Sequence, residues 1–219
     1  MVTYEDIRHN ESIKTYIDQA DKSLLALGYT EHSFAHVTMV AKTAKDILTT
    51  LGYPEHDIEL VQIAAHLHDI GNLVNRIEHS QSGAILAFQI LNALNMPPED
   101  IALICTAIGN HDEGTGVPVN HIAAALILGD KTDVRRSRVR NQDITSFDIH
   151  DRVNYSVQSA DTKIDTKTNT FTLSLLIDDH YGSIMDYFEI FLNRMILCRK
   201  AALMLGLTFQ LIINEQQVI

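Results

Sequence analysis

The stretch Ala64-Ala65-His66-Leu67-His68-Asp69-Ile70-Gly71 decides how this chain folds and what it can bind. It follows an apolar helical run, residues 58–63, and ends in a glycine suited to the left-handed position that closes helices. His68 and Asp69 stand just before that end. A cation beside the last helical turn could accept both side chains, because imidazole and carboxylate are common ligands of Zn, Mn and Fe. A solvated helix end would also explain the pair, so the remaining sequence has to distinguish the two.

Composition describes a globular protein with one large domain, or a medium domain plus a small one. The chain has 219 residues, of which 46% are hydrophobic and 21% charged. The formal net charge of −11 argues against non-specific binding to nucleic acid or to anionic membranes. Small phosphorylated substrates remain compatible with this charge, because a bound cation inverts the local field.

Several features point to the cytoplasm. The N-terminus shows no secretion signal, and no apolar run is long enough to span a bilayer. Cys105 and Cys198 lie far apart in apolar helical patterns, so we expect two buried free thiols in a reducing compartment.

Apolar residues recur at helical spacing through the first two thirds of the chain. This spacing predicts helices at about residues 4–27, 30–51, 55–70, 80–94, 97–110 and 120–134. Gly28 and Gly52 close the first two helices. The small residues Ser82-Gly83-Ala84 would let the fourth helix pack closely against a neighbour.

The pattern changes after a basic run at residues 135–140. Segments 152–157 and 170–175 alternate with period two around the polar segment 161–169, which predicts a β-hairpin. A helix over 181–205, closed by Gly206, and a strand over 207–213 follow. The expected fold class is therefore mainly α. It comprises a helical bundle over residues 1–145 and a small α+β domain of β-β-α-β order over residues 146–219.

Two further potential ligands occupy the helical part. His36 lies on the second predicted helix, and Asp130 follows an apolar run on the sixth. A buried carboxylate is costly unless it is paired or bound to metal. Asp130 could instead lie at an exposed helix end, or pair with Lys131 or an arginine.

The order His36, His68-Asp69, Asp130-Lys131 across successive helices resembles the HD-domain superfamily of metal-dependent phosphohydrolases. The resemblance covers roughly residues 20 to 140. It implies a helical HD bundle with His36, His68, Asp69 and Asp130 as metal ligands.

His79 and His111 fall where the dinuclear branches of this superfamily, including the HD-GYP phosphodiesterases, carry extra ligands. Residues 114–118 are similar to the glycine-rich loop of those enzymes. Gly-Tyr-Pro is absent, however, and Asp112 stands where a second consecutive histidine would be, so we do not expect a cyclic-dinucleotide substrate. A helix-capping role for His79 and surface exposure of His111 are the alternatives. Whether Asp112 or His32 is a ligand stays open.

This resemblance implies a site with about two divalent transition metals per chain, Fe, Mn or Zn, with Mg also compatible. Asp69 would bridge the two metals. The remaining ligands would be His36, His68 and Asp130 on one metal and His79 and His111 on the other.

Cationic side chains near these ligands are candidates for binding substrate phosphates. Arginine offers bidentate hydrogen bonds to phosphate, and Lys131 follows a ligand directly. A solvated linker is the alternative reading of the arginine run. Glu113 is a candidate proton shuttle, so that the expected catalytic residues are Asp69, Lys131 and Glu113. The candidate phosphate-binding residues are Lys131, Arg76, Arg135 and Arg138, with Arg136 and Arg140 in the same run.

The expected activity is hydrolysis, through a metal-activated water, of a phosphate ester or anhydride in a nucleotide or similar small molecule. Residues 129–135 are also similar to the HD-type dinucleoside tetraphosphatases, whose last ligand aspartate precedes a lysine. A di-iron oxygenase and a catalytically silent binding or regulatory module are the alternatives. The expected partner is a small phosphorylated substrate, not nucleic acid or membrane, and the C-terminal domain could support a homodimer. The histidines expected to be structural are His9, His56, His66, His121, His150 and His180.

Overall fold

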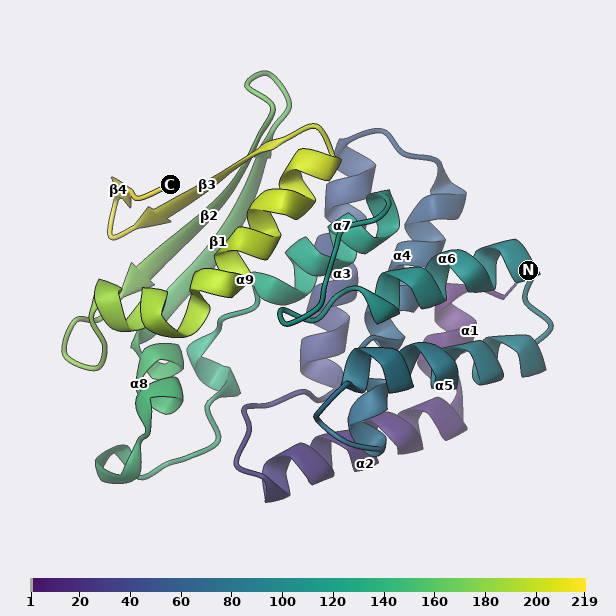
Figure 1. Ribbon diagram of the computed structural model, residues 1–219, viewed down its shortest axis with the longest axis horizontal. Coiled ribbons are helices and arrows are strands. Elements are labelled where there is room, and N and C mark those ends of the chain that lie inside the picture. The colour runs from purple at the N-terminus through teal and green to yellow at the C-terminus, as the bar shows by residue number, and fades with distance from the viewer. Residues whose placement is uncertain (1) are drawn as a thin grey trace.

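Helices make up most of the molecule, and a small sheet forms near the C-terminus (Figure 1). The computed structural model describes residues 2–219. The α-helices are α1 (Tyr4–His9), α2 (Glu11–Ala26), α3 (Phe34–Thr50), α4 (Glu55–Leu67), α5 (His79–Ala93), α6 (Pro98–Gly109), α7 (His121–Lys131), α8 (Ile149–Ser156) and α9 (Ile184–Met204). The short 3-10 helices are η1 (Ile70–Leu73), η2 (Arg136–Arg138) and η3 (Ile144–Ser146). The prediction of a mainly helical fold with a C-terminal sheet is confirmed.

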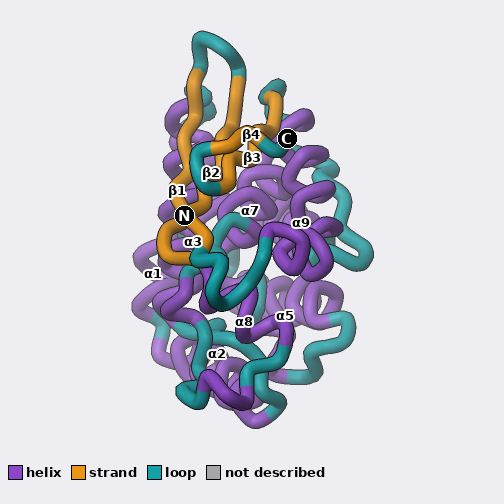
Figure 2. Tube along the Cα trace, turned by 90° about the vertical axis from the view of Figure 1, so that its left-hand side faces the viewer, coloured by secondary structure: helices purple, strands orange, loops and turns teal. Residues whose placement is uncertain are grey.

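The sheet contains strands β1 (Val157–Asp165), β2 (Thr170–Ile177), β3 (Thr208–Ile213) and β4 (Gln216–Gln217), in that spatial order. The pairs β1–β2 and β3–β4 are antiparallel. The pair β2–β3 is parallel, and α9 provides the crossover between these two strands. Alternate residues of β2 and β3 are buried, so one face of the sheet packs against the helices. Figure 2 shows the strands gathered at one end of the molecule.

Helix α7 lies at the centre of the helical part. Its apolar run, residues 122–128, is completely buried, as expected for a helix that is hydrophobic on all sides. Helices α3, α4, α6 and α9 all pack against it. One continuous apolar core therefore joins the helices to the sheet. None of the helices within residues 2–219 combines the length and apolar character needed to cross a bilayer.

The predicted strand at residues 152–157 is wrong for all but its last residue. Residues 149–156 form α8, which begins after Asp148, whose side chain accepts a hydrogen bond from the Asp151 amide. The hairpin uses β1 instead, so part of the segment expected as a polar loop is strand. β1 lies at the edge of the sheet, where polar side chains face solvent. The polar residues 161–165 therefore belong to an exposed edge strand and not to a loop.

Two predicted helices begin or break elsewhere because polar side chains cap them. The helix expected over residues 4–27 is divided at Asn10, whose side chain accepts hydrogen bonds from the amides of Ser12 and Ile13 and starts α2. The second helix begins at Phe34 after the cap Ser33, not at residue 30. Residues 28–33 therefore form a connecting loop.

The position of Gly71 in the sequence suggested a left-handed residue that closes a helix, but this prediction is wrong. Gly71 lies in η1, where a Cβ atom would be 1.9 Å from the backbone oxygen of His79. The close packing expected around Gly83 is confirmed, since a Cβ there would lie 3.1 Å from the His68 carbonyl. The turn that carries His68 and Asp69 thus contacts the backbone of α5. The left-handed helix ends are Gly28, Gly52, Asn95 and Gly206.

Both cysteines are free thiols, as expected. Cys198 is buried, but Cys105 is only partly buried and its thiol donates a hydrogen bond to the Ala84 carbonyl.

Candidate metal centre

The six side chains expected as metal ligands converge around the end of α4. His68 and Asp69 directly follow this helix. The others come from α3, the first residue of α5, the residue after Asn110 at the end of α6, and the last turn of α7. Each of the six is at most 8% exposed, the set being His36, His68, Asp69, His79, His111 and Asp130.

Asp69 lies between two sets of histidines. Its Oδ2 atom is 3.2 Å from His68 Nε2 and 3.7 Å from His36 Nε2. Its Oδ1 atom is 3.4 Å from His79 Nε2 and 3.9 Å from His111 Nε2. Each carboxylate oxygen therefore faces a different pair of imidazoles, which is the arrangement a bridging carboxylate requires.

Asp130 completes the first of these sets. Its Oδ1 atom is 3.3 Å from His36 Nε2 and 3.6 Å from His68 Nε2. The ligand atoms of His36, His68 and Asp130 lie within 4.8 Å of one another, as do those of His68, Asp69 and His111. Both groups could hold a metal ion.

The opposite ring nitrogens show how the histidines are oriented. In all four rings Nδ1 contacts a backbone carbonyl or a carboxylate, and such an acceptor requires a proton on Nδ1. In the neutral form of each ring, Nε2 then carries the lone pair, and this atom points toward the centre. The Nε2 atoms of His36 and His68 are buried without a hydrogen-bond partner in the described chain, as metal ligands would be. The Nδ1 contacts are His36 to Asp133 Oδ2 (2.8 Å), His68 to Ala65 O (2.7 Å), His79 to Arg76 O (3.1 Å) and His111 to Ile108 O (2.6 Å).

Charge at the centre is balanced through His68. Burial alone would lower its pKa, but the carboxylates of Asp69 and Asp130 outweigh burial and raise the pKa to about 10. Burial lowers the pKa of His79 and, more strongly, that of His111, so both rings are neutral. Neutral imidazoles and ionised carboxylates are the forms that bind metals, so a bound cation would displace the proton that raises the charge of His68.

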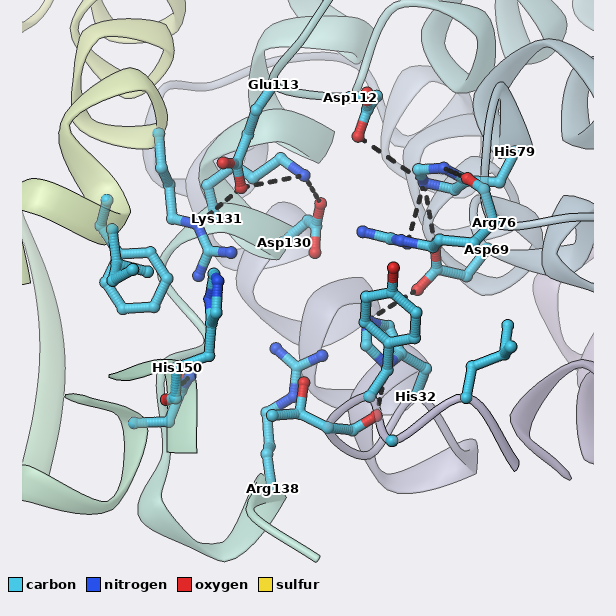
Figure 3. Close-up of a pocket in the computed structure, with 18 of the residues that line it drawn as sticks. His32, Asp69, Arg76, His79, Asp112, Glu113, Asp130, Lys131, Arg138 and His150 are labelled. Carbon is cyan, nitrogen blue, oxygen red and sulfur yellow. Dashed lines mark hydrogen bonds and ion pairs between the residues drawn. The ribbon is translucent and has the colours of Figure 1, made fainter. Parts of the chain in front are cut away.

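A cavity of about 530 Å³ opens beside these residues. Figure 3 shows Glu113, Lys131 and Asp130 on one side and Asp69, His79 and Arg76 on the other. Arg138 points into the space between them, and His150 lies on the side of Lys131. The cavity is also lined by residues 27–30 of the loop before α3 and by Ile190, Phe191 and Arg194 of α9.

Three of the expected phosphate-binding residues line this cavity: Arg76, Lys131 and Arg138. Lys131 Nζ is 2.7 Å from Asp130 Oδ2. Asp130 therefore forms the salt bridge that was the alternative to a ligand role, and it also lies among the candidate ligands. Arg138 is buried, and its guanidinium donates to the backbone carbonyls of Glu31 (2.9 Å) and Asp133 (2.7 Å). These partners fix its geometry without neutralising its charge.

Glu113 lines the same cavity as a carboxylate. Burial would raise its pKa, but Arg194 and Lys131 lower the pKa below its usual value. Glu113 is therefore ionised at neutral pH and is able to accept a proton.

The other three arginines of the basic run lie away from the cavity lining. Arg135 donates two hydrogen bonds to the carboxylate of Asp133. Arg136 stacks on Tyr155, with its Cζ atom 4.5 Å from the ring centroid. Arg140 pairs with Asp21. Arg135 consequently orients the partner of His36 rather than facing the cavity.

The structure also brings residues to the site that sequence reasoning had not assigned to it. His32 lies 4.0 Å from Asp69 Oδ2, and Asp112 lies 3.9 Å from His79 Nε2, so both questions left open concern residues at the centre. Sequence spacing could have identified Asp133, because it lies three residues after Asp130 and residues i and i+3 share a helix face. His150, expected to be structural, and Arg194 gave no local signal.

Known proteins are similar to this chain over more than half of its length. A curated protein of Methanocaldococcus jannaschii, the uncharacterized protein MJ1020, is 27% identical to this chain and covers 73% of it, with 70% of its own length aligned. A solved structure, a predicted HD superfamily hydrolase from an uncultured Thermotogales bacterium, aligns with a TM-score of 0.46 and 22% identity, over 58% of this chain and 69% of that one. Residues 33–151 match the model of the HD domain, and this segment contains all six converging side chains. Since the match spans more than half of the sequence, the chain belongs to the HD-domain family.

Proposed function

We propose that this protein is a metal-dependent phosphohydrolase acting on a phosphate ester or anhydride of a nucleotide or similar small phosphorylated molecule. The carrying observation is the position of Asp69, whose two oxygens face separate pairs of imidazoles. Membership of the HD-domain family supports a metal-dependent hydrolase in general.

The donor set fits two divalent cations. Histidine nitrogens with carboxylate oxygens suit Mn, Fe and Zn. We assign one cation to His36, His68 and Asp130, the second to His79 and His111, with Asp69 shared. When bound, such a pair lowers the pKa of a water molecule and balances charge on the phosphoryl oxygens.

Cationic groups favour a phosphorylated substrate. Arg138 presents a fixed guanidinium with uncharged partners, and Arg76 and Lys131 face the same cavity. Arginine can bind phosphate oxygens in a bidentate manner, and lysine acts as a point charge. These three side chains would hold the substrate phosphate, and the ionised Glu113 would accept a proton from the attacking water.

The test combines elemental analysis with turnover of a panel of phosphomonoesters and nucleotides. We expect about two metals per chain in the wild-type protein. His68→Ala and Asp69→Ala should each lose metal and activity while keeping the helical circular-dichroism spectrum, because they remove ligands without removing apolar core.

His180→Ala provides the matched control, because this side chain is 92% exposed and lies outside the cavity lining. It should keep both metal and activity. Full phosphatase activity in either ligand variant would contradict the proposed site. A ratio near one metal per chain would remove His79 and His111 from the ligand set.

A further inference from the structure

A chain of charged side chains connects α9 to the metal centre. Arg194 Nε lies 2.7 Å from Glu113 Oε1. The same carboxylate oxygen is 3.8 Å from Lys131 Nζ, which is 2.7 Å from Asp130 Oδ2. Arg194 belongs to α9, which lies entirely after the segment 33–151 that matches the family.

The position of Arg194 is fixed by its surroundings. Its guanidinium carbon lies 4.1 Å from the centroid of the Phe191 ring, and its side chain is only 19% exposed. Phe191 is itself buried, and α9 packs against α7, the helix that carries Asp130 and Lys131. Arg194 is thus a preorganised cation, which loses little conformational entropy when it holds Glu113.

The distances indicate how the two cations share one carboxylate. Glu113 is mostly buried, and a buried carboxylate needs a counter-charge. Arg194 supplies it at hydrogen-bond distance, whereas Lys131 is farther from Glu113 than from Asp130. Without Arg194, Lys131 would be the nearest remaining cation and would be drawn toward Glu113.

We propose that Arg194 is a positioning residue of the metal site. By holding Glu113, it keeps the ammonium group of Lys131 at the Asp130 side of the cavity, where that ammonium can bind a substrate phosphoryl group. This inference rests on the proposed function, and it assigns to α9 a part in phosphate binding.

Two other roles for Arg194 give different outcomes. A direct phosphate ligand would be lost in any variant without Arg194, whatever stands at position 113. A purely packing role on Phe191 would also be indifferent to the charge at position 113. Positioning through Glu113 predicts that neutralising Glu113 releases Lys131 and compensates for the loss of Arg194.

The experiment measures binding of inorganic phosphate to the metal-loaded full-length protein by isothermal titration calorimetry. Arg194→Met should weaken phosphate binding about tenfold, the effect of losing one charge-assisted hydrogen bond. The double variant Arg194→Met/Glu113→Gln should bind within about threefold of wild type. Arg194→Lys, which keeps a cation on α9, should bind more tightly than Arg194→Met.

Arg199→Met is the matched control, because Arg199 is an exposed residue of the same helix. It removes one positive charge and should bind phosphate as wild type does, which separates local positioning from long-range charge. Metal content, measured for every variant, should stay at the wild-type ratio.

Equal weakness of Arg194→Met and the double variant would overturn the inference, as would unchanged binding by Arg194→Met or absence of phosphate binding in the wild type. Turnover is measured separately. Phosphate binding in the expected order without hydrolysis of any phosphorylated compound would contradict the proposed function and leave the positioning role standing. Hydrolysis by the wild type, together with phosphate binding that stays as weak in the double variant as in Arg194→Met, would support the proposed function and contradict the positioning role.

Discussion

The orientation of a histidine in this protein depends on what its second ring nitrogen contacts. In the four candidate ligands Nδ1 is bound to an acceptor, and Nε2 faces the centre. His66 lies two residues before His68, yet both of its ring nitrogens are buried without a partner in the described chain. It packs edge-on against Tyr4, with ring centroids 5.7 Å apart. His66 is therefore a neutral core residue.

This environment predicts a pH dependence of stability. Burial is the main reason that the pKa of His66 is lowered from 6.5 to about 4, with further lowering by Arg8 and His68. In the unfolded chain, His66 becomes protonated below about pH 6.5, whereas in the folded chain it becomes protonated only below about pH 4. The contribution of neutral His66 to the free energy of unfolding is therefore fully present above pH 6.5. It is lost as the pH falls toward 4, by at most about 3 kcal/mol.

Urea unfolding of the metal-chelated protein at several pH values between 7 and 4 measures this effect. The variant His66→Phe keeps an aromatic ring beside Tyr4 and should lose less stability over this range than wild type. His180→Phe, at an exposed position, should follow the wild-type curve. Identical pH dependence in wild type and His66→Phe would show that His66 is not the titrating group.

The sequence was most informative where short motifs carry the ligands. His68-Asp69 and Asp130-Lys131 are local patterns, and the structure brings them together with His36. The arginine run was ambiguous because residues in a 3-10 helix point in different directions, so that only Arg138 of the run lines the cavity. Arg194 was missed because its helix reaches the site through tertiary packing, which local spacing does not encode.

At the scale of elements, the contact between η1 and α5 positions both halves of the candidate metal centre. Asp69 precedes η1 and His79 begins α5, so their separation depends on how closely these elements approach. Gly71 permits the approach, since an added Cβ would lie 1.9 Å from His79 O and 2.5 Å from Gly83 N. Both of these atoms are backbone and cannot move aside by a rotamer change.

Gly71→Ala should therefore destabilise the protein by about 2 kcal/mol or more, because overpacking forces backbone shifts. It should also weaken metal retention, because Asp69 and His79 would move apart. Thermal unfolding and competition with a chelator measure the two effects. Gly109→Ala is the control, because the nearest atom to its Cβ would be Ala84 Cβ at 3.7 Å and alanine favours helices. Equal stability and metal retention in both variants would contradict this role of Gly71.

The elements near residue 150 show where sequence patterns fail. Residues 152–157 alternate with period two, but the segment is too short to distinguish a strand from one and a half turns of helix. Asp148 caps the N-terminus of α8 and so favours the helix over a strand. This choice matters to the site, because the cavity is lined by Asp148, His150, Asp151 and Asn154 from this region.

At the scale of the whole molecule, the segment after residue 145 contributes to the core and to the site. α9 packs against α7 and buries Tyr187, Met195 and Cys198 among the residues of the single apolar core. The same helix directs Phe191 and Arg194 to the cavity. The boundary near residue 145 stays a prediction, but the core continues across it.

A protein truncated to residues 1–145 tests whether the helical part is an independent domain. Truncation would uncover the side of α7 that packs on α9, and an exposed apolar helix face favours aggregation. We expect the fragment to be aggregated or to melt without a cooperative transition, and to retain less metal than the full chain, because α7 carries Asp130. Size-exclusion chromatography, thermal melting and elemental analysis measure these properties. A monomeric fragment with a cooperative melt and the full metal content would show that α9 is an addition to a domain that folds alone. The expected result would mean that the fold and the candidate metal site of this protein depend on its C-terminal segment.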